Sequence, residues 1–367
     1  MSGNIGGVTI ADRWREIGGS PSGFDYLRLA LAILILFWHS YQVSYGTYAA
    51  VAFWQDARGT LLPLILPCFF ALSGFLVSGS LYRNPDLKTF LSLRMIRIFP
   101  ALSVESVLAA MVLGPALTTY SLAQYFSDPR FPTYFLNMVG DIHYFLPGVF
   151  AANPETGYVN GQLWTVPYEL LCYVALSLFY LIGAVANRRL LLVGFAGSTS
   201  ALAVWNALHD SPALTAVGLT GRMLVLCFLG GVVIHAYRDR IVWRASLAVG
   251  CGGLALLVLR FYAQRAPFLV YITPILIAYV TVYIGLLNPR RSVVIDAGDF
   301  SYGIYLYSCP LQQAVAAAFG VRGGWAQNVA ISLPICLCFS LLSWRCVEKP
   351  FVKLRRFIGA KPSPTHS

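Results

Sequence analysis

Long apolar runs recur along this chain and constrain its fold more than any other feature. Their length, about 17–25 residues, matches the thickness of the hydrocarbon core of a bilayer. Within lipid every backbone N–H and C=O must be satisfied internally, which favours helices. The sequence therefore predicts an all-α polytopic membrane protein with about ten transmembrane helices, near residues 24–43, 61–80, 101–118, 162–182, 189–206, 218–236, 245–261, 268–287, 300–319 and 327–345.

The composition supports a membrane protein and argues against other classes. Only 11% of the 367 residues are charged, against about a quarter in soluble domains. The net charge of +11 is scattered over short connectors, so no nucleic-acid partner is expected. The eight cysteines lie in or beside apolar segments without a CxxC pair. Such cysteines behave as small buried hydrophobes, and neither a disulfide framework nor a metal site is expected.

The basic residues also predict the orientation of the chain. Lysine and arginine concentrate in alternate connectors, which is typical of cytoplasmic loops. The opposite connectors hold few basic residues, namely Arg58, Arg130, Arg265 and Arg322, with Arg260 close by. We therefore expect both termini in the cytoplasm. The chain is expected to consist of an N-terminal tail without a cleavable signal (1–23), a membrane domain (24–345) with an external loop (119–161), and a C-terminal tail (346–367). An external loop this long is expected to be folded or functional.

Two ionisable residues, Arg28 and His39, bracket the first apolar run. Eleven residues of α-helix turn through about 1,100° and rise about 16 Å, so both side chains share one helix face. Ionisable groups at membrane depth usually serve a function. A structural role is the alternative for each: Arg28 snorkels to the interface or pairs with Asp25, and His39 forms an ordinary hydrogen bond. The spacing suits a long anionic ligand held by Arg28, with His39 handling a proton at its far end.

Three further charged residues belong to the same hypothesis. Arg94 and Arg97 precede the third span at i, i+3 spacing, with Pro100 expected in its first turn. They are either topology anchors or a clamp for phosphate, whose oxygens guanidinium groups bind in bidentate fashion. Glu169 lies about seven residues into the fourth span. It either pairs with an arginine or accepts a hydrogen bond from His39 and sets its tautomer. Glu105, in the third span, is a weaker candidate.

Small and aromatic residues mark two other segments. Residues 69–80, FFALSGFLVSGS, have the small-x-small spacing of close helix packing and alternatively line a passage for a slender ligand arm. The segment SYGIYLYSCP places Tyr302, Tyr305 and Ser308 along the ninth helix, where the tyrosines contact either a sugar or one another. An aromatic belt at the membrane interface is the alternative explanation.

Taken in order, these motifs resemble a known family. FDYLR…WH, FFALSGF, RMIRIFP, LWTVPYE, SYGIYL and the terminal VEKPF occur in the order found in the acyltransferase 3 family, from Phe24 to about Phe351. Those proteins are bacterial integral-membrane acyltransferases that O-acetylate cell-envelope and secreted carbohydrates. The resemblance implies a ten-helix bundle in the bacterial inner membrane, with no permanently bound cofactor. The donor would be acetyl-coenzyme A, or another acyl-coenzyme A, taken from the cytoplasm. The acceptor would be a carbohydrate hydroxyl, for example on lipopolysaccharide or exopolysaccharide.

The resemblance also implies roles for individual residues. Arg28, Arg94 and Arg97 would hold the phosphates of coenzyme A, and His39 would be the general base, oriented by Glu169. Weaker candidates for contact with the acceptor are Trp164, Tyr168, Tyr302, Tyr305 and Ser308. Ser308 stands where relatives often carry histidine, and no fused extracytoplasmic esterase-like domain is expected.

One alternative mechanism and two alternative functions remain to be weighed. Nothing in the sequence excludes an acyl-histidine intermediate. A polytopic transporter or flippase of a glycolipid or anionic solute also carries intramembrane Arg, His and Glu, but transporters usually show matched halves, and no internal repeat is apparent. A non-catalytic membrane scaffold would not need a buried imidazole.

Overall fold

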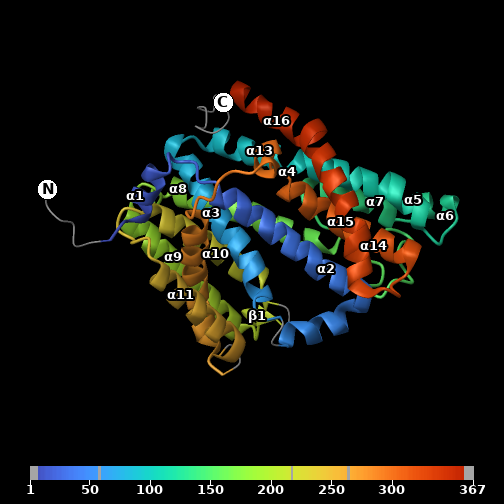
Figure 1. Ribbon diagram of the computed structural model, residues 1–367, viewed down its shortest axis with the longest axis horizontal. Coiled ribbons are helices and arrows are strands. Elements are labelled where there is room, and N and C mark those ends of the chain that lie inside the picture. The colour runs from blue at the N-terminus through green and yellow to red at the C-terminus, as the bar shows by residue number, and fades with distance from the viewer. Residues whose placement is uncertain (1–6, 57–58, 216–217, 263–264, 359–367) are drawn as a thin grey trace.

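The computed structural model describes residues 7–56, 59–215, 218–262 and 265–358 (Figure 1). Sixteen α-helices and one two-stranded sheet make up this part of the chain. The elements are α1 Ile10–Glu16, α2 Gly23–Gln55, α3 Ile65–Arg83, α4 Leu87–Leu108, α5 Gly114–Leu117, α6 Leu122–Ser127, α7 Arg130–Tyr134, α8 Val166–Leu181, α9 Arg188–Leu208, β1 Leu214–Thr215, β2 Gly218–Leu219, α10 Gly221–Ala236, α11 Ala245–Leu257, α12 Thr273–Gly285, α13 Val293–Ala297, α14 Ser301–Phe319, α15 Gly324–Ser343 and α16 Lys349–Lys353.

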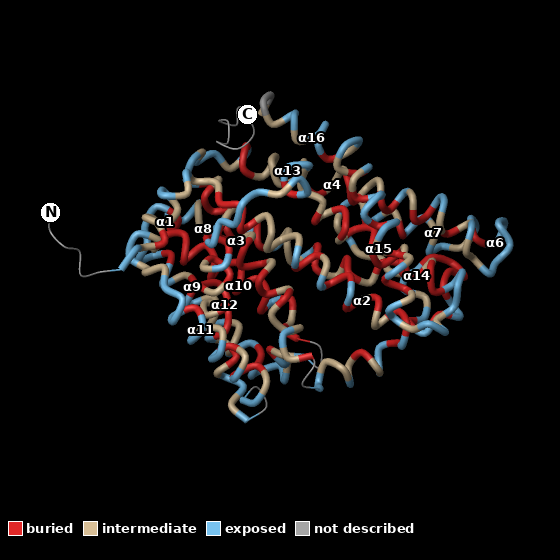
Figure 2. The backbone as a smooth tube through the Cα atoms, viewed as in Figure 1, coloured by how far each residue is buried: buried red, intermediate tan, exposed pale blue. Residues whose placement is uncertain are grey.

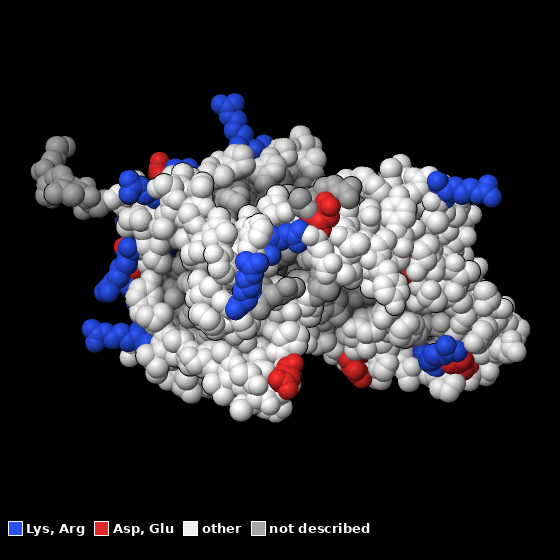
Figure 3. Space-filling model, turned by 90° about the horizontal axis from the view of Figure 1, so that it is seen from below, with Lys and Arg blue, Asp and Glu red and all other residues white. Residues whose placement is uncertain are grey.

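The predicted all-α membrane fold is confirmed, and each of the ten expected spans corresponds to a helix. Eight helical segments of the described residues are long and apolar enough to cross a membrane. The other two are α10, which has only 16 residues, and α14, which carries polar side chains such as Gln312 and Gln313. The face seen in Figure 3 is largely uncharged, with Lys, Arg, Asp and Glu in scattered groups.

The helices form two packed groups with α2 between them (Figure 1). One group joins α3, α8, α9, α10, α11 and α12, and the other pairs α14 with α15 against α2. Helix α10 is the centre of the first group, because every residue in it except Arg222 is buried (Figure 2). A helix that is apolar on all sides belongs in a protein interior, which explains why α10 need not be long enough to span a membrane alone.

Glycines allow α3 and α10 to pack backbone against backbone. A Cβ atom on Gly74 would overlap the carbonyl oxygen of Phe228, and one on Gly231 would overlap that of Ala71. The small residues predicted to mediate close packing in the segment 69–80 therefore do so. Helix association in lipid relies on such van der Waals contact, because lipid tails supply no hydrophobic driving force.

Substituting Gly74 by alanine is expected to lower the free energy of unfolding by about 1–3 kcal/mol, because the added methyl group forces the two backbones apart. Gly197→Ala on α9 is the matched control, since a Cβ there meets nothing within 4 Å. Thermal unfolding of the two variants in detergent measures the difference. Equal stability of both variants would contradict a tight contact between α3 and α10.

Helix α4 begins earlier than predicted, and this changes the setting of two candidate residues. Its first residue is Leu87, and the Asp86 side chain caps it by accepting a hydrogen bond from Thr89 N at 2.8 Å. Pro100 therefore lies inside the helix and not in its first turn. Arg94 and Arg97 consequently lie in the second and third turns of a helix that enters the bundle. They do not lie in a connector ahead of it.

Both termini of the described chain pack against the same end of the helix bundle. Thr9 bridges to Val242 in the connector after α10, and α1 follows it directly. At the other end, the chain stays helical to Ile358, where the carbonyl accepts a hydrogen bond from Thr89 at the start of α4. The regions predicted as polar tails thus both contain helix, and both lie where α2 and α4 begin. We call this the N-terminal end of the bundle.

The opposite end is covered by the long segment between α5 and α8. It contains α6 and α7, and backbone bridges join Thr118 to Val149 and Phe145 to Tyr158. Buried aromatic side chains such as Tyr125 and Tyr134 give it a core of its own. The expectation that residues 119–161 are folded is therefore confirmed.

Candidate active site

Two adjoining cavities lie beside α2 between the helix groups. The outer cavity, of about 600 Å³, contains His39, Gln162 and Glu155 in its lining. The inner cavity, of about 230 Å³, lies closer to the N-terminal end and contains Arg28, Arg94, Arg97 and Glu169. Four residues line both cavities and form the wall between them: Ile35, Leu66, Thr165 and Tyr305. Tyr305 and Thr165 hydrogen-bond to each other across this wall at 3.0 Å.

Helix α2 itself connects the cavities. Arg28 faces the inner one and His39 the outer one, as expected for two residues that share a helix face. Beyond His39 the helix bends at Gly46, whose φ of 81° favours glycine, and a Cβ there would lie 2.9 Å from the carbonyl oxygen of Pro154. The bend carries Ala50 and Trp54 around the outer cavity, so that one helix supplies both its imidazole and part of its wall.

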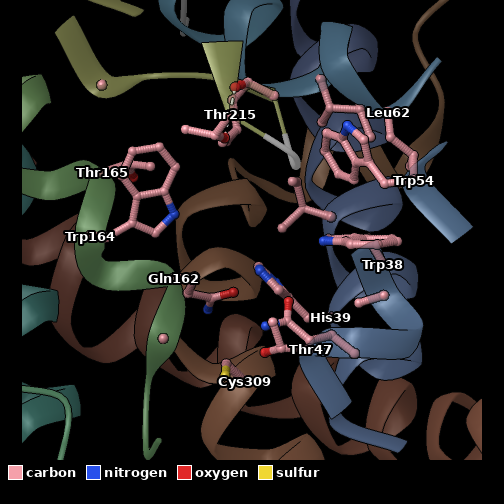
Figure 4. A pocket seen from close by; sticks show the side chains of 18 of the residues that line it. Trp38, His39, Thr47, Trp54, Leu62, Gln162, Trp164, Thr165, Thr215 and Cys309 are labelled. Atoms are coloured by element: carbon pink, nitrogen blue, oxygen red, sulfur yellow. Dashed lines mark hydrogen bonds between the residues drawn. The ribbon is translucent and has the colours of Figure 1, made fainter. Parts of the chain in front are cut away.

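The imidazole of His39 has a neutral partner. Its ring faces the side chain of Gln162, and Figure 4 shows the two groups pointing toward each other. Of the two ring nitrogens, Nδ1 is buried without a hydrogen-bond partner in the described structure, which leaves Nε2 for Gln162 and the cavity. Gln162 Oε1 also accepts a hydrogen bond from Ser308 at 3.2 Å, whereas its Nε2 has no partner among the described residues. Unsatisfied buried donors are unfavourable unless a ligand completes them.

Glu169 does not contact His39, so the predicted pairing of these two side chains is wrong. Its Oε1 accepts a hydrogen bond from Tyr173 at 2.6 Å, and its carboxylate lines the inner cavity with the arginines. The alternative stated from the sequence, an association of Glu169 with arginine, fits the structure. The physical reason is that the face of α8 that carries Glu169 turns toward α4, while Gln162 in the preceding 3-10 turn, Gly161–Thr165, reaches His39.

The three predicted arginines come together in the inner cavity, and two of them share one carboxylate. Asp299 Oδ2 accepts from Arg28 Nη1 at 2.7 Å and from Arg97 Nη2 at 2.6 Å. Arg97 also reaches Glu348 at 3.3 Å. Arg94 differs from both, because in the described part of the chain it forms no ion pair and its Nε is buried without a partner. Arg94 is therefore the cation best placed to receive an anionic ligand.

Burial disfavours the charged form of Asp299, but the charges of Arg97 and Arg28 and the hydrogen bonds from Ser301 outweigh it. They hold the pKa of this carboxyl well below its usual range. Asp299 lies in the turn before α14, adjoining the SYGIYL segment. Asp299 was not predicted from the sequence, although its position two residues before the SYGIYL segment was the available signal.

The weaker candidates divide between the two cavities. Trp164 and Tyr168 line the outer cavity, and Tyr305 lines both. Tyr302 lines the inner cavity and donates a hydrogen bond to the carbonyl of Ile98 at 2.9 Å. Ser308 acts through Gln162, as described above.

The outer cavity combines indole rings with a few polar groups. Trp164 lies on one side of it, and Trp38 and Trp54 lie on the other (Figure 4). Glu155, from the covering segment, is 8% exposed and accepts hydrogen bonds from Thr47 at 2.8 Å and from Gln42 at 3.1 Å. Such a lining suits a ligand with apolar faces and hydroxyl groups.

Glu105 belongs to neither cavity. It is 1% exposed, and its Oε1 accepts a hydrogen bond from Asn160 at 2.9 Å. Asn160 also donates to the carbonyl of Leu306, so Glu105 helps to join α4 to α14. Its role is structural.

Comparison with known proteins identifies the class. Residues 22–345 match the family model described as an acyltransferase domain, and the chain belongs to the acyltransferase 3 family. It is 28% identical to an O-acetyl transferase of Shigella phage Sf6 over 336 residues, covering 90% of this chain and 95% of the relative. It is 26% identical to Nodulation protein 10 of Rhizobium leguminosarum bv. viciae, covering 94% and 96% respectively. No solved structure matches the chain significantly. The protein is therefore a multi-pass membrane O-acyltransferase.

Proposed function

We propose that this protein transfers an acetyl group from acetyl-coenzyme A to a hydroxyl of a carbohydrate, in the bacterial cytoplasmic membrane. Lipopolysaccharide and exopolysaccharide are the acceptors we expect. The observation that carries the proposal is the pair of cavities with a common wall. One is lined by arginines, and the other by an imidazole and indole rings. The similarity to a protein named O-acetyl transferase supports acetyl as the group transferred.

The inner cavity supplies the chemistry that the donor requires. Coenzyme A is a long molecule with phosphates at one end and the thioester at the other. Guanidinium groups bind phosphate oxygens through short, charge-assisted hydrogen bonds. Arg94 has a free donor for them, while Arg28 and Arg97 add positive charge next to it. In this proposal coenzyme A enters from the cytoplasm and its phosphates bind in the inner cavity. The arm that carries the thioester then passes Thr165 and Tyr305 toward His39.

The transfer step uses His39 as general base. Its Nε2 takes the proton of the acceptor hydroxyl while the oxygen attacks the thioester carbonyl carbon. The carbon–sulfur bond then breaks, and the leaving thiolate takes the proton from the imidazolium. Gln162 Oε1 accepts a hydrogen bond from the protonated ring, and its free Nε2 donates to the oxyanion that develops on the carbonyl. A preorganised donor of this kind contributes roughly 10²–10³-fold in rate.

The outer cavity supplies the acceptor site. The indole faces of Trp38, Trp54 and Trp164 would lie against sugar rings, and the carboxylate of Glu155 would accept hydrogen bonds from hydroxyls. Glu155 comes from the segment that covers this end of the bundle. The acceptor in this proposal therefore arrives from the side opposite the donor.

Mass spectrometry of envelope and secreted polysaccharides tests the proposed function. Cells that express the protein should carry carbohydrate with an added mass of about 42 Da, which is the mass of one acetyl group, and cells without it should not. Polymer export should be equal in both. Loss of exported polymer without any change in acetylation would point to a transporter and would overturn the proposal.

A further inference from the structure

A second basic cavity lies at the N-terminal end of the bundle, separate from both cavities described above. It has a volume of about 460 Å³ and lies between α1, α3 and the end of α10. Its lining includes Trp14, Arg15, Tyr82, Arg83, His235 and Arg238. None of these residues lines the inner or the outer cavity.

Among the residues that the structure describes, the lining contains three arginines and no carboxylate. Arg15, at its exposed rim, pairs with Asp12 at 2.6 Å. Arg238 Nη1 donates to the carbonyl oxygen of His235 at 2.6 Å. Arg83 forms no ion pair and no hydrogen bond in the part of the chain that the structure describes. Arg83 and Arg238 thus line the same cavity, and the carboxylate that acts on Arg238, that of Asp239, is itself paired with Arg188 at 2.7 Å.

A buried imidazole completes the cluster. His235 is 7% exposed, and its Nδ1 is buried without a hydrogen-bond partner in the described structure. The charges of Arg238 and Arg83 act on this ring, and it packs against Tyr82 with 5.3 Å between ring centroids. A Cβ on Gly79 would lie 3.0 Å from the imidazole Cε1, so the glycine makes room for the ring. The ring hydrogen-bonds to the backbone of Phe75, so Nδ1 is the nitrogen left without a partner. A buried ring nitrogen without a partner, next to an arginine that pairs with no carboxylate of the described residues, is a polar site that an anionic ligand would complete.

We propose that this cavity binds the phosphate group of an organic phosphate. Phosphate offers several acceptor oxygens, which Arg83 and Arg238 can bind together, with His235 Nδ1 as a further donor once the bound anion has drawn a proton onto the ring, while Trp14 and Tyr82 provide aromatic surface for the attached organic part. The cavity lies at the bundle end to which the donor is proposed to come. Along α3, Arg83 is seven residues beyond Leu76 of the inner cavity, a rise of about 10 Å. The phosphate group would belong either to a nucleotide or to the headgroup of an anionic lipid.

Binding to the purified, detergent-solubilised full chain tests the proposal without any acyl transfer. Isothermal titration with adenosine 3′,5′-bisphosphate represents the nucleotide, and titration with dioctanoyl phosphatidylglycerol represents the anionic lipid. At least one of them should bind. Substituting Arg83→Gln should weaken that binding about tenfold, and adding Arg238→Gln about tenfold more, because each removes charged hydrogen bonds.

Three controls make the result specific. Arg83→Gln alone removes no contact of the described structure, so it should fold normally. The double variant Arg189→Gln, Arg240→Gln removes two exposed arginines near the same end and should bind like the wild type. Arg94→Gln tests the inner cavity. Binding that is lost in Arg94→Gln but unchanged in Arg83→Gln, or no binding of either compound by the wild type, would overturn the proposal.

Discussion

Replacing His39 by alanine is expected to abolish acyl transfer while the protein still folds. General base catalysis contributes roughly 10²–10⁴-fold in rate, and among the described residues that line the outer cavity His39 supplies the one imidazole. The side chain takes part in no ion pair of the described structure, and the side chain that it faces is the neutral Gln162. Its loss therefore removes chemistry without leaving a buried charge unpaired. The measurement is the rate of acetyl transfer by purified protein at saturating donor.

Two further variants define the result. His209→Ala is the matched control, because His209 is exposed at the end of α9, stacks on Trp205 and lines neither cavity. It should transfer acetyl groups at the wild-type rate. The transfer rate of Gln162→Leu should lie between those of the wild type and His39→Ala, about 10²-fold below the wild type, because this variant lacks the oxyanion donor but keeps the base. A His39→Ala protein that retains a tenth or more of the wild-type rate would show that another group activates the acceptor.

The helices were predictable because apolar length is a local property of the sequence. The expected third span was the exception. Arg94, Arg97 and Pro100 look like a connector, but in the structure α4 passes straight through them from Leu87. The arginines are tolerated inside a helix because Asp299 and Glu348, from distant parts of the chain, pair with one of them. Such compensation between distant segments has no signal in the local sequence.

The candidate site was predictable only along a single helix. The spacing of Arg28 and His39 correctly placed them on one face of α2, because helix geometry relates residues of the same element. It did not show that the wall formed by Thr165 and Tyr305 separates them into two cavities. The partner of His39 was predicted as Glu169, but the side chain that His39 faces is Gln162, seven residues earlier in the 3-10 turn before α8. Which residue of one helix faces another depends on how both are rotated, and a single sequence does not contain that information.

Asp299→Asn is expected to lower the free energy of unfolding by about 3 kcal/mol. This is near the lower end of the range for breaking a buried ion pair, since 26% of the side chain is exposed. The substitution leaves Arg28 and Arg97 close together without the carboxylate they share. Asp296→Asn is the control, because Asp296 is 58% exposed and pairs only at the surface with Arg291. Asp296→Asn should lower the free energy of unfolding by less than about 1 kcal/mol. Denaturation in mixed detergent measures both.

The pH dependence separates the loss of charge from a change in packing. The pKa of Asp299 is lowered in the folded protein, so the folded state keeps its carboxylate when the unfolded state takes up a proton. The stabilisation is therefore complete above about pH 4, the ordinary value for Asp, and declines as the pH falls below it. The difference in stability between wild type and Asp299→Asn should shrink over the same range. A difference that stays constant down to pH 3 would mean that Asp299 holds α2, α4 and α14 together by shape, and that its charge contributes nothing.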